Sequence, residues 1–203
     1  MTKYHHGNLR KALVEAAADL ARATGPDGVV LREVARQTGV SHNAAYRHFT
    51  DRQALLDAVA TLAMDRLEEA MLRRIDTVTG DDPGTVARRR LREVGVAYVT
   101  FALAEPGLFE VAFAADEPQP PVSVPEPSKG GPYGVLGRVL DELVAAGELT
   151  DKRRQGADVV CWAAVHGFAM LYLHGPLRGT PPELRDVPLG LLLDTVDRGL
   201  TRP

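Results

Sequence analysis

The sequence predicts an all-α protein of about nine helices. Apolar residues recur three or four positions apart through most of the 203 residues, which is the spacing of a buried helix face. Residues 31–52 read as a helix, a tight turn and a second short helix. Glycine and proline residues, which end helices, separate the helical stretches. We therefore expect an N-terminal three-helix domain with a helix-turn-helix, followed by a helical C-terminal domain.

The composition is typical of a soluble globular protein, with 45% hydrophobic and 25% charged residues. No apolar run is long enough to cross a bilayer, and the polar start of the chain is unlike a signal peptide. We expect a cytoplasmic protein that does not enter a membrane. Cys161 is the only cysteine, so no intrachain disulfide can form.

The charge is divided unevenly along the chain. Residues 1–52 carry 8 Lys and Arg against 5 Asp and Glu, a net charge of +3, whereas residues 53–203 carry 16 against 22, a net charge of −6. A mildly basic head beside an acidic body suits a protein whose first part touches nucleic-acid phosphate. Because the head is only mildly basic, we expect weak non-specific binding and a need for two copies.

The first predicted helix begins at an Asn8 cap and runs to about Thr24, where Gly25 and Pro26 end it. Before it stand two adjacent histidines, His5 and His6. They fit an arm along a phosphate backbone or plain disorder better than a metal site, since neighbouring side chains without partner ligands coordinate poorly. We expect no metal and no cofactor.

The helix-turn-helix of residues 31–52 has a distinctive outer face. Gly39 tolerates the left-handed turn that ends its first helix, and Ser41 can cap the second. Ala45 and Phe49 face inward, which leaves polar, aromatic and cationic side chains outside, where they can meet base edges and phosphates in a major groove. The alternative interpretation is a plain solvated helix face.

The flanks of this segment carry a resemblance to a known family. With YHHGNLR at residues 4–10 and RQALL at residues 52–56, the segment closely resembles the DNA-binding domain of TetR/AcrR-family transcriptional regulators. Val30 departs from the pattern, because the family usually has Ser or Thr there to cap the second helix. We therefore expect that helix to lack a side-chain N-cap, a loss of about 1 kcal/mol.

The resemblance implies DNA contacts at nine positions of this chain: Arg32, Ser41, His42, Asn43, Ala44, Tyr46, Arg47, His48 and Arg52. Among these, His42, Asn43 and Arg47 are the candidates for reading bases, because amides pair with adenine and cations with guanine. Tyr46, His48 and Arg52 are expected to hold phosphates, and Ser41 to serve its helix before the DNA.

A long fourth helix, from about residue 51 to 75, should connect two domains, 1–52 and 53–203. Thr50 followed by Gln53 predicts a capping box at its start. A fifth helix at about 83–104 carries arginines at positions 88, 89, 90 and 92. They could form a second nucleic-acid site, but neighbouring glutamates favour a solvated face.

The C-terminal half predicts a homodimer. Residues 116–132 are too rich in proline to form a helix and should be a flexible loop. Helices are expected at about 133–146, 151–174 and 186–200. The last two are more apolar than one small domain can bury, so we expect them to pair with their copies in a second chain, a two-fold arrangement that suits a palindromic DNA site.

A second resemblance covers this half. YVTFALAEPGLFEVAF at residues 98–113, with Trp162 and His166-Gly167, is similar to the C-terminal domain named for its Trp-His-Gly (WHG) motif in the same branch of the TetR family. It implies dimerisation and an effector cavity. The candidate lining residues are Tyr98, Phe101, Phe109, Phe113, Trp162, His166 and Met170. Aromatic residues at helical spacing also fit an ordinary core.

These observations favour a homodimeric repressor that binds a palindromic operator and is released by an unknown small-molecule effector. The alternative is a DNA-binding activator or architectural protein whose C-terminal half only dimerises. An enzyme is the least favoured class, because we find no glycine-rich phosphate loop, no nucleophile elbow and no metal-ligand spacing.

Overall fold

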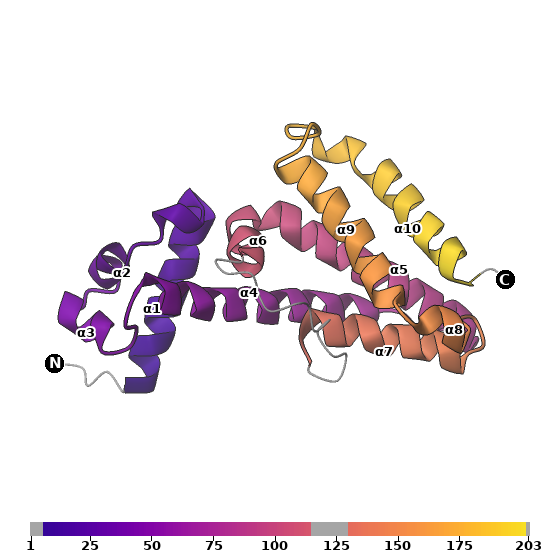
Figure 1. Ribbon diagram of the computed structural model, residues 1–203, viewed down its shortest axis with the longest axis horizontal. Helices are drawn as coiled ribbons and strands as arrows, with labels where there is room; N and C mark the ends of the chain where they lie inside the picture. The colour runs from indigo at the N-terminus through magenta and orange to yellow at the C-terminus, as the bar shows by residue number, and fades with distance from the viewer. Residues whose placement is uncertain (1–5, 115–129, 202–203) are drawn as a thin grey trace. The chain divides into compact units, whose positions relative to one another are not determined.

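The structure, a computed structural model, describes residues 6–114 and 130–201. Within these ranges it contains ten α-helices, two 3₁₀-helices and no strand, which confirms the predicted all-α class (Figure 1). No single described helix is long and apolar enough to span a membrane. Among the described helices, α5 (Pro83–Ala104) and α6 (Pro106–Phe113) reach the length and apolar composition of a membrane span only when they are counted together. The chain bends sharply between them.

Packing divides the described chain into two compact units. The first comprises the residues up to Asp65 and, later in the chain, Glu105 to Ala114. It contains α1 (His6–Thr24), η1 (Pro26–Gly28), α2 (Leu31–Gln37), α3 (His42–Tyr46), the start of α4 (Arg52–Ile75) and α6. The second contains the end of α4, α5, α7 (Gly131–Ala145), α8 (Asp151–Arg154), α9 (Ala157–Leu173), η3 (Pro182–Leu184) and α10 (Asp186–Thr201).

In the first unit, α6 packs closely against α1. A Cβ atom added at Gly107 would lie 1.9 Å from the carbonyl oxygen of Ala21, so only glycine allows the two helices to approach this closely. Beside this contact the Nε of Arg22 donates to a carboxylate oxygen of Glu105 at 2.5 Å. Helix α6, which follows α5 in the chain, is therefore part of the same compact unit as the helix-turn-helix.

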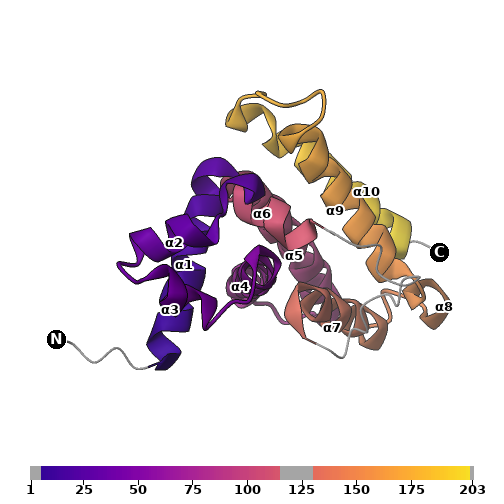
Figure 2. The ribbon, with the colours of Figure 1, turned by 60° about the vertical axis from the view of Figure 1, so that its left-hand side comes forward.

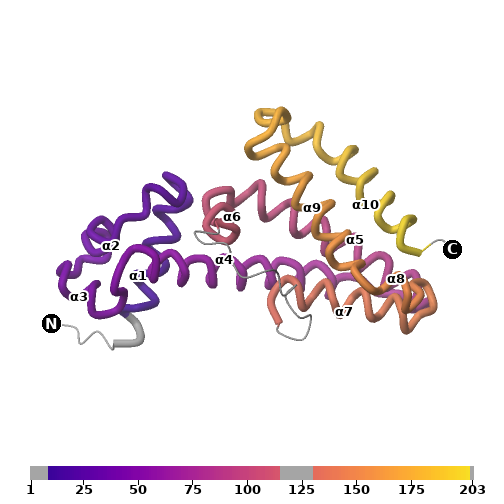
Figure 3. The backbone as a smooth tube through the Cα atoms, in the orientation of Figure 1, coloured from indigo at the N-terminus to yellow at the C-terminus, as the bar shows by residue number. Residues whose placement is uncertain are grey.

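In the second unit, α5 packs against both α7 and α9, and α10 lies beside α9 (Figures 1 and 2). Gly95 of α5 provides a notch for α10, since a Cβ there would lie 2.5 Å from Cδ2 of Leu193. Helix α4 is continuous from Arg52 to Ile75 (Figure 3), and the two units share it.

Three predicted boundaries are wrong for local reasons. Helix α1 begins at His6, before the start that was expected at Asn8. The single helix expected at 151–174 is broken into α8 and α9 by Gly156, whose φ of 81° is left-handed and cannot continue a helix. Gly131 and Pro132, expected in the loop, begin α7, because proline suits a first helical turn.

Two predictions about the organisation of the chain remain predictions. Most of the loop expected at 116–132, up to residue 129, lies outside the described residues. The domain boundary expected between residues 52 and 53 differs from the division by packing, which cuts α4 after Asp65 and places α6 in the first unit.

Candidate nucleic-acid interface

The helix-turn-helix forms as its sequence predicts. Gly39 has a φ of 69°, and the N–H of Val40 donates to the carbonyl of Ala35 at 3.0 Å to close the turn. The hydroxyl of Ser41 then accepts the N–H of Ala44 at 3.2 Å, which is the predicted cap. Since the first residues of α3 follow directly, the turn and the cap together set the direction in which this helix presents its side chains.

Burial separates the two faces of α3. Ala45 is fully buried and Phe49 is nearly so, whereas the outer face is open to solvent. Of the nine predicted contact residues, seven are exposed, namely Arg32, Ser41, His42, Asn43, Tyr46, Arg47 and Arg52, and two, Ala44 and His48, are half-buried. The rings of His42 and Tyr46 lie 4.4 Å apart between centroids, so these two side chains form one aromatic patch.

The N-termini of α2 and α4 differ from each other in their caps. Val30 precedes α2 in an extended conformation and makes no side-chain cap, as predicted. The capping box expected from Thr50 and Gln53 is wrong. Asp51 caps α4 instead, because its Oδ1 accepts the N–H of Ala54 at 2.8 Å. Aspartate is as good an N-cap residue as threonine, and Asp51 directly follows Thr50, so the sequence alone could have predicted this cap.

Two arginines have structural contacts that the sequence did not reveal. The guanidinium of Arg10 lies 5.1 Å from the ring centroid of Phe49, which ties α1 to the residue behind α3. The guanidinium of Arg52, predicted to hold phosphate, donates to the carbonyls of Val29 and Pro26. Both contacts join residues more than 20 positions apart, beyond the reach of any local pattern.

The predicted effector-pocket residues fall into separate groups. In the second unit the hydroxyl of Tyr98 lies 2.8 Å from Nδ1 of His166, and Nε1 of Trp162 donates to the same hydroxyl at 3.2 Å. Burial raises the pKa of Tyr98 and lowers the pKa of His166. These three side chains therefore form a polar cluster that joins α5 to α9, with the histidine favoured in its neutral form.

The other four candidates lie elsewhere. Phe109 and Phe113 belong to α6 in the first unit and contact each other, with ring centroids 4.7 Å apart. Phe101 is buried in α5, and Met170 of α9 is exposed. The single cavity that the resemblance implied from these seven residues stays a prediction.

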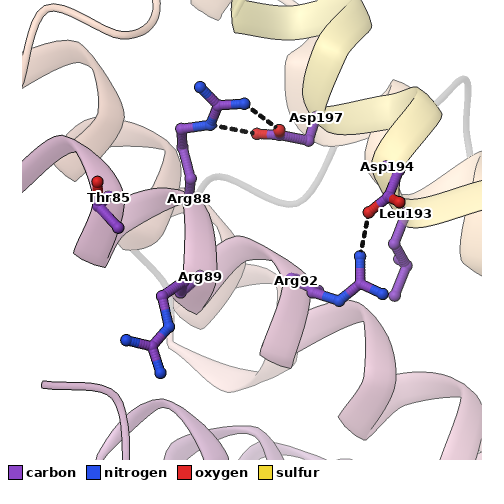
Figure 4. A pocket seen from close by; sticks show the side chains of 7 residues that line it. All are labelled: Thr85, Arg88, Arg89, Arg92, Leu193, Asp194 and Asp197. Carbon is purple, nitrogen blue, oxygen red and sulfur yellow. Dashed lines mark hydrogen bonds and ion pairs between the residues drawn. The ribbon is translucent and has the colours of Figure 1, made fainter. Parts of the chain in front are cut away.

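The arginines of α5 are partly solvated, as expected, but three of the four also form ion pairs. Arg88 pairs with Asp197 at 2.6 Å and with Glu148 at 3.4 Å, Arg90 pairs with Glu142 at 3.0 Å, and Arg92 pairs with Asp194. The ion pairs with Asp194 and Asp197 hold α5 against α10. The same side chains border an open hollow of about 290 Å³ (Figure 4). Its lining consists of Thr85, Arg88, Arg89, Arg92, Leu193, Asp194 and Asp197.

Apolar side chains remain uncovered on α9 and α10 within one chain. Val187 and Leu191 of α10 are 79% and 62% exposed, and Val160 of α9 is 53% exposed. Gly167, also on α9, is exposed, and a Cβ added there would meet no atom within 4 Å among the described residues beyond its own stretch of helix. The expected surplus of apolar surface on the last two helices is therefore present in the folded chain.

No cluster of three or more His, Cys, Asp or Glu side chains suited to a metal ion occurs in residues 6–114 and 130–201. Cys161 is buried, and burial raises the pKa of its thiol to about 12, which disfavours the reactive thiolate.

Two family models match this chain. One, described as the tetracyclin repressor-like C-terminal domain, matches residues 91–196, and the other, described as bacterial regulatory proteins of the tetR family, matches residues 13–59. The Trp-His-Gly type of C-terminal domain stays a prediction.

Relatives and solved structures agree with these matches. The nucleoid occlusion factor SlmA of Vibrio campbellii is 29% identical over 105 residues, which are 51% of this chain and 50% of SlmA, so the match spans about half the length of that curated relative. A Rhodococcus sp. RHA1 protein of unknown function is 34% identical with a TM-score of 0.79, and the alignment covers 100% of both chains. A TetR variant from Acinetobacter baumannii AYE, solved with minocycline, has 20% identity and a TM-score of 0.65 over 97% of this chain and 96% of its own, which shows a shared fold.

Proposed function

Since this chain belongs to the TetR family of DNA-binding transcriptional regulators, we propose that it is a homodimeric repressor of a palindromic operator, released by a small-molecule effector. The observation that carries the proposal is the short α3, which buries Ala45 and leaves His42, Asn43 and Tyr46 exposed at a capped helix-turn-helix. A helix of this kind enters the major groove, where its exposed side chains meet base edges.

Dimerisation is supported by the uncovered apolar side chains of α9 and α10. Two copies of such a surface, related by a two-fold axis, bury each other, and the same axis relates the two half-sites of a palindrome. Each recognition helix then meets one half-site, with the centres roughly 34–36 Å apart.

Release by an effector would act through the elements that connect the two units. Helix α4 is shared by both, and α5 leads directly into α6, which packs on α1 through Gly107. An effector that binds one arrangement of the second unit more tightly changes the population of the arrangement that fits the operator. Linkage then requires operator DNA to weaken effector binding by the same factor.

The test of the proposal is selection of random duplex DNA by the purified protein at two salt concentrations. Enrichment of a palindrome with half-sites about one helical turn apart, surviving the higher salt, supports the specific dimeric regulator. Recovery of no motif, with binding lost as salt rises, contradicts it.

The first prediction concerns base reading by Asn43. Because an amide can pair with adenine in two hydrogen bonds, Asn43→Ala should relax the preference at one position of each half-site, at a cost of about 1–3 kcal/mol. Competition binding against singly substituted operators measures this. A loss that is equal for operator and random DNA would show that Asn43 does not read a base.

A second function has support of its own. Tyr98, Trp162 and His166 hydrogen-bond to one another, and one of the relatives that match half of this chain is named a nucleoid occlusion factor. The hydrogen bonds among these three side chains favour a C-terminal half that only dimerises, and the name of the relative is compatible with an architectural role on DNA. A screen in which no compound raises the unfolding temperature or weakens operator binding would support this alternative.

A further inference from the structure

Arg52, the first residue of α4, uses its guanidinium inside the first unit. Its Nε donates to the carbonyl oxygen of Val29 at 2.9 Å, and its Nη2 donates to that of Pro26 at 2.7 Å. Both carbonyls belong to the short connection between α1 and α2. We propose that Arg52 is a positioning residue for operator recognition, which holds the start of α2 against the start of α4. The proposal rests on the operator-binding function inferred above.

The start of α2 is held by burial and by Arg52, and not by a side-chain cap. Its first residue, Leu31, is 4% exposed. The helix has only seven residues, and Val30 gives it no side-chain cap, so neither its length nor a cap defines its first turn. The side chain of Val29 is fully buried and anchors the extended segment before α2 from one side. Arg52 holds the carbonyl of the same residue. With these two attachments, the peptide before α2 cannot rotate without breaking a hydrogen bond or exposing a valine.

The orientation of α2 governs that of α3. The N–H of Val40 in the turn donates to Ala35 of α2, and α3 starts two residues later at His42. A tilt of α2 is therefore carried directly into α3, and with it the positions of the side chains that would meet base edges. Arg52 acts on recognition through this path, without itself reading a base.

Arginine suits this task for a geometric reason. Its planar guanidinium presents several N–H donors in a fixed fork, so that two of them reach the two carbonyls together. Lysine carries the same charge on a flexible stem, as a single point. The nearby carboxylate of Asp27 contributes little, because it is fully exposed and lies 3.9 Å from Nη2.

Two other roles for Arg52 make different predictions. A phosphate contact depends on charge, so Arg52→Lys would bind like the wild type. Arg52→Ala would flatten the log–log salt dependence by about 0.9 for each of the two copies in the dimer. A residue that only stabilises the fold would lower the unfolding temperature and leave the affinity of the folded protein unchanged. Positioning predicts that Arg52→Lys and Arg52→Ala are equally impaired for the operator.

The experiment compares the wild type, Arg52→Lys and Arg52→Ala on the selected operator and on random duplex, at a temperature where circular dichroism shows all three folded. Arg138→Ala, at an exposed residue of α7 that is not among the predicted DNA contacts, serves as the control for loss of one exposed cation. Amide exchange of Glu33 and Val34, whose N–H groups both donate to the carbonyl of Val30, is followed in the DNA-free proteins.

We expect Arg52→Lys to lose at least tenfold in operator affinity, to change less than twofold on random duplex, to keep the wild-type salt slope, and to exchange Glu33 and Val34 faster. Wild-type affinity and exchange in Arg52→Lys would overturn the proposal, as would a lowered unfolding temperature alone. If the wild type selects no operator, the repressor function fails separately, and the exchange rates still decide whether Arg52 holds α2.

Discussion

Two residues that precede helices, Val30 and Asp51, show how a single side chain sets the start of an element. Asp51 satisfies a backbone N–H of α4 with its carboxylate, whereas Val30 offers no acceptor to α2. Val30 nevertheless has the extended backbone, with φ of −120° and ψ of 128°, that a capping residue needs. The position is therefore shaped for a cap that its side chain cannot make.

A residue-scale prediction follows for Val30→Ser. Serine at this position should accept an orphan N–H of α2 and stabilise the protein by about 1 kcal/mol, and little burial is lost because Val30 is 49% exposed. Urea unfolding measures the change, with Val30→Ala, which removes the same side chain without supplying an acceptor, as the control. A variant that unfolds at lower urea than the wild type would contradict the argument.

The neutral imidazole of His166 predicts a pH dependence. Burial lowers its pKa below the usual 6.5, so below that pH the unfolded chain binds the proton more readily than the folded one. This contribution to stability is complete above about pH 6.5 and is lost as the pH falls through that value towards the folded pKa. The free energy of unfolding should therefore fall on acidification.

The matched variant is His166→Gln, which keeps an acceptor for the Tyr98 hydroxyl but does not titrate. Denaturant unfolding between pH 8 and pH 5 should show a smaller loss of stability on acidification in this variant than in the wild type. Identical profiles would mean that the folded protein takes up the proton at His166 without a penalty.

At the scale of elements, glycine occupies positions within the helices for different physical reasons. Gly107 is required inside one chain, because a Cβ there would collide with the backbone of Ala21, whereas Gly95 leaves room for the side chain of Leu193. Gly167 has no such neighbour, although glycine in mid-helix costs about 1 kcal/mol relative to alanine. Its place on the uncovered side of α9, close to Ala163, suggests that a second copy of α9 approaches there.

Gly167→Leu tests this idea. The substitution should improve the helix within one chain, yet weaken the dimer at least tenfold if a second α9 crosses near Gly167. Sedimentation equilibrium measures the dissociation constant, and Arg138→Leu on α7 controls for an added exposed leucine. An unchanged dimer with a raised unfolding temperature would place the contact elsewhere.

At the scale of the whole molecule, recognition and assembly depend on each other. The first 52 residues have a net charge of only +3, and α3 offers few side chains to DNA. A single copy therefore gains little from phosphates, and two joined copies gain because the second contact becomes intramolecular. The apolar face of α10 should then be as necessary for operator binding as α3.

The double variant Val187→Asp, Leu191→Asp should separate assembly from folding. Both side chains are largely exposed in one chain, so the helical fold should remain while the dimer dissociates at micromolar concentration. Operator affinity should fall at least a hundredfold, and weak binding to random duplex should persist. Thr100→Asp on α5 is the control, and a monomeric variant with wild-type operator affinity would refute the dependence.

Local chemistry in the sequence determined which segments are helical and where most of them end. The spacing of apolar residues, the Gly25-Pro26 break, the turn at Gly39 and the Ser41 cap all act within a few residues, and the resemblance to one family added the candidate DNA contacts. The break between α8 and α9 at Gly156 also has a local cause, but the sequence did not predict it. A lone glycine is compatible with both a continuous helix and a left-handed turn.

Only the tertiary structure decided which distant side chains meet. No nearby residue in the sequence shows that Asp197 and Asp194 of α10 pair with Arg88 and Arg92, or that Arg52 donates to the carbonyls of Val29 and Pro26. The grouping of α6 with α1 likewise depends on one close approach at Gly107. Such contacts join residues from 23 to 109 positions apart, and no periodicity within a segment carries that information.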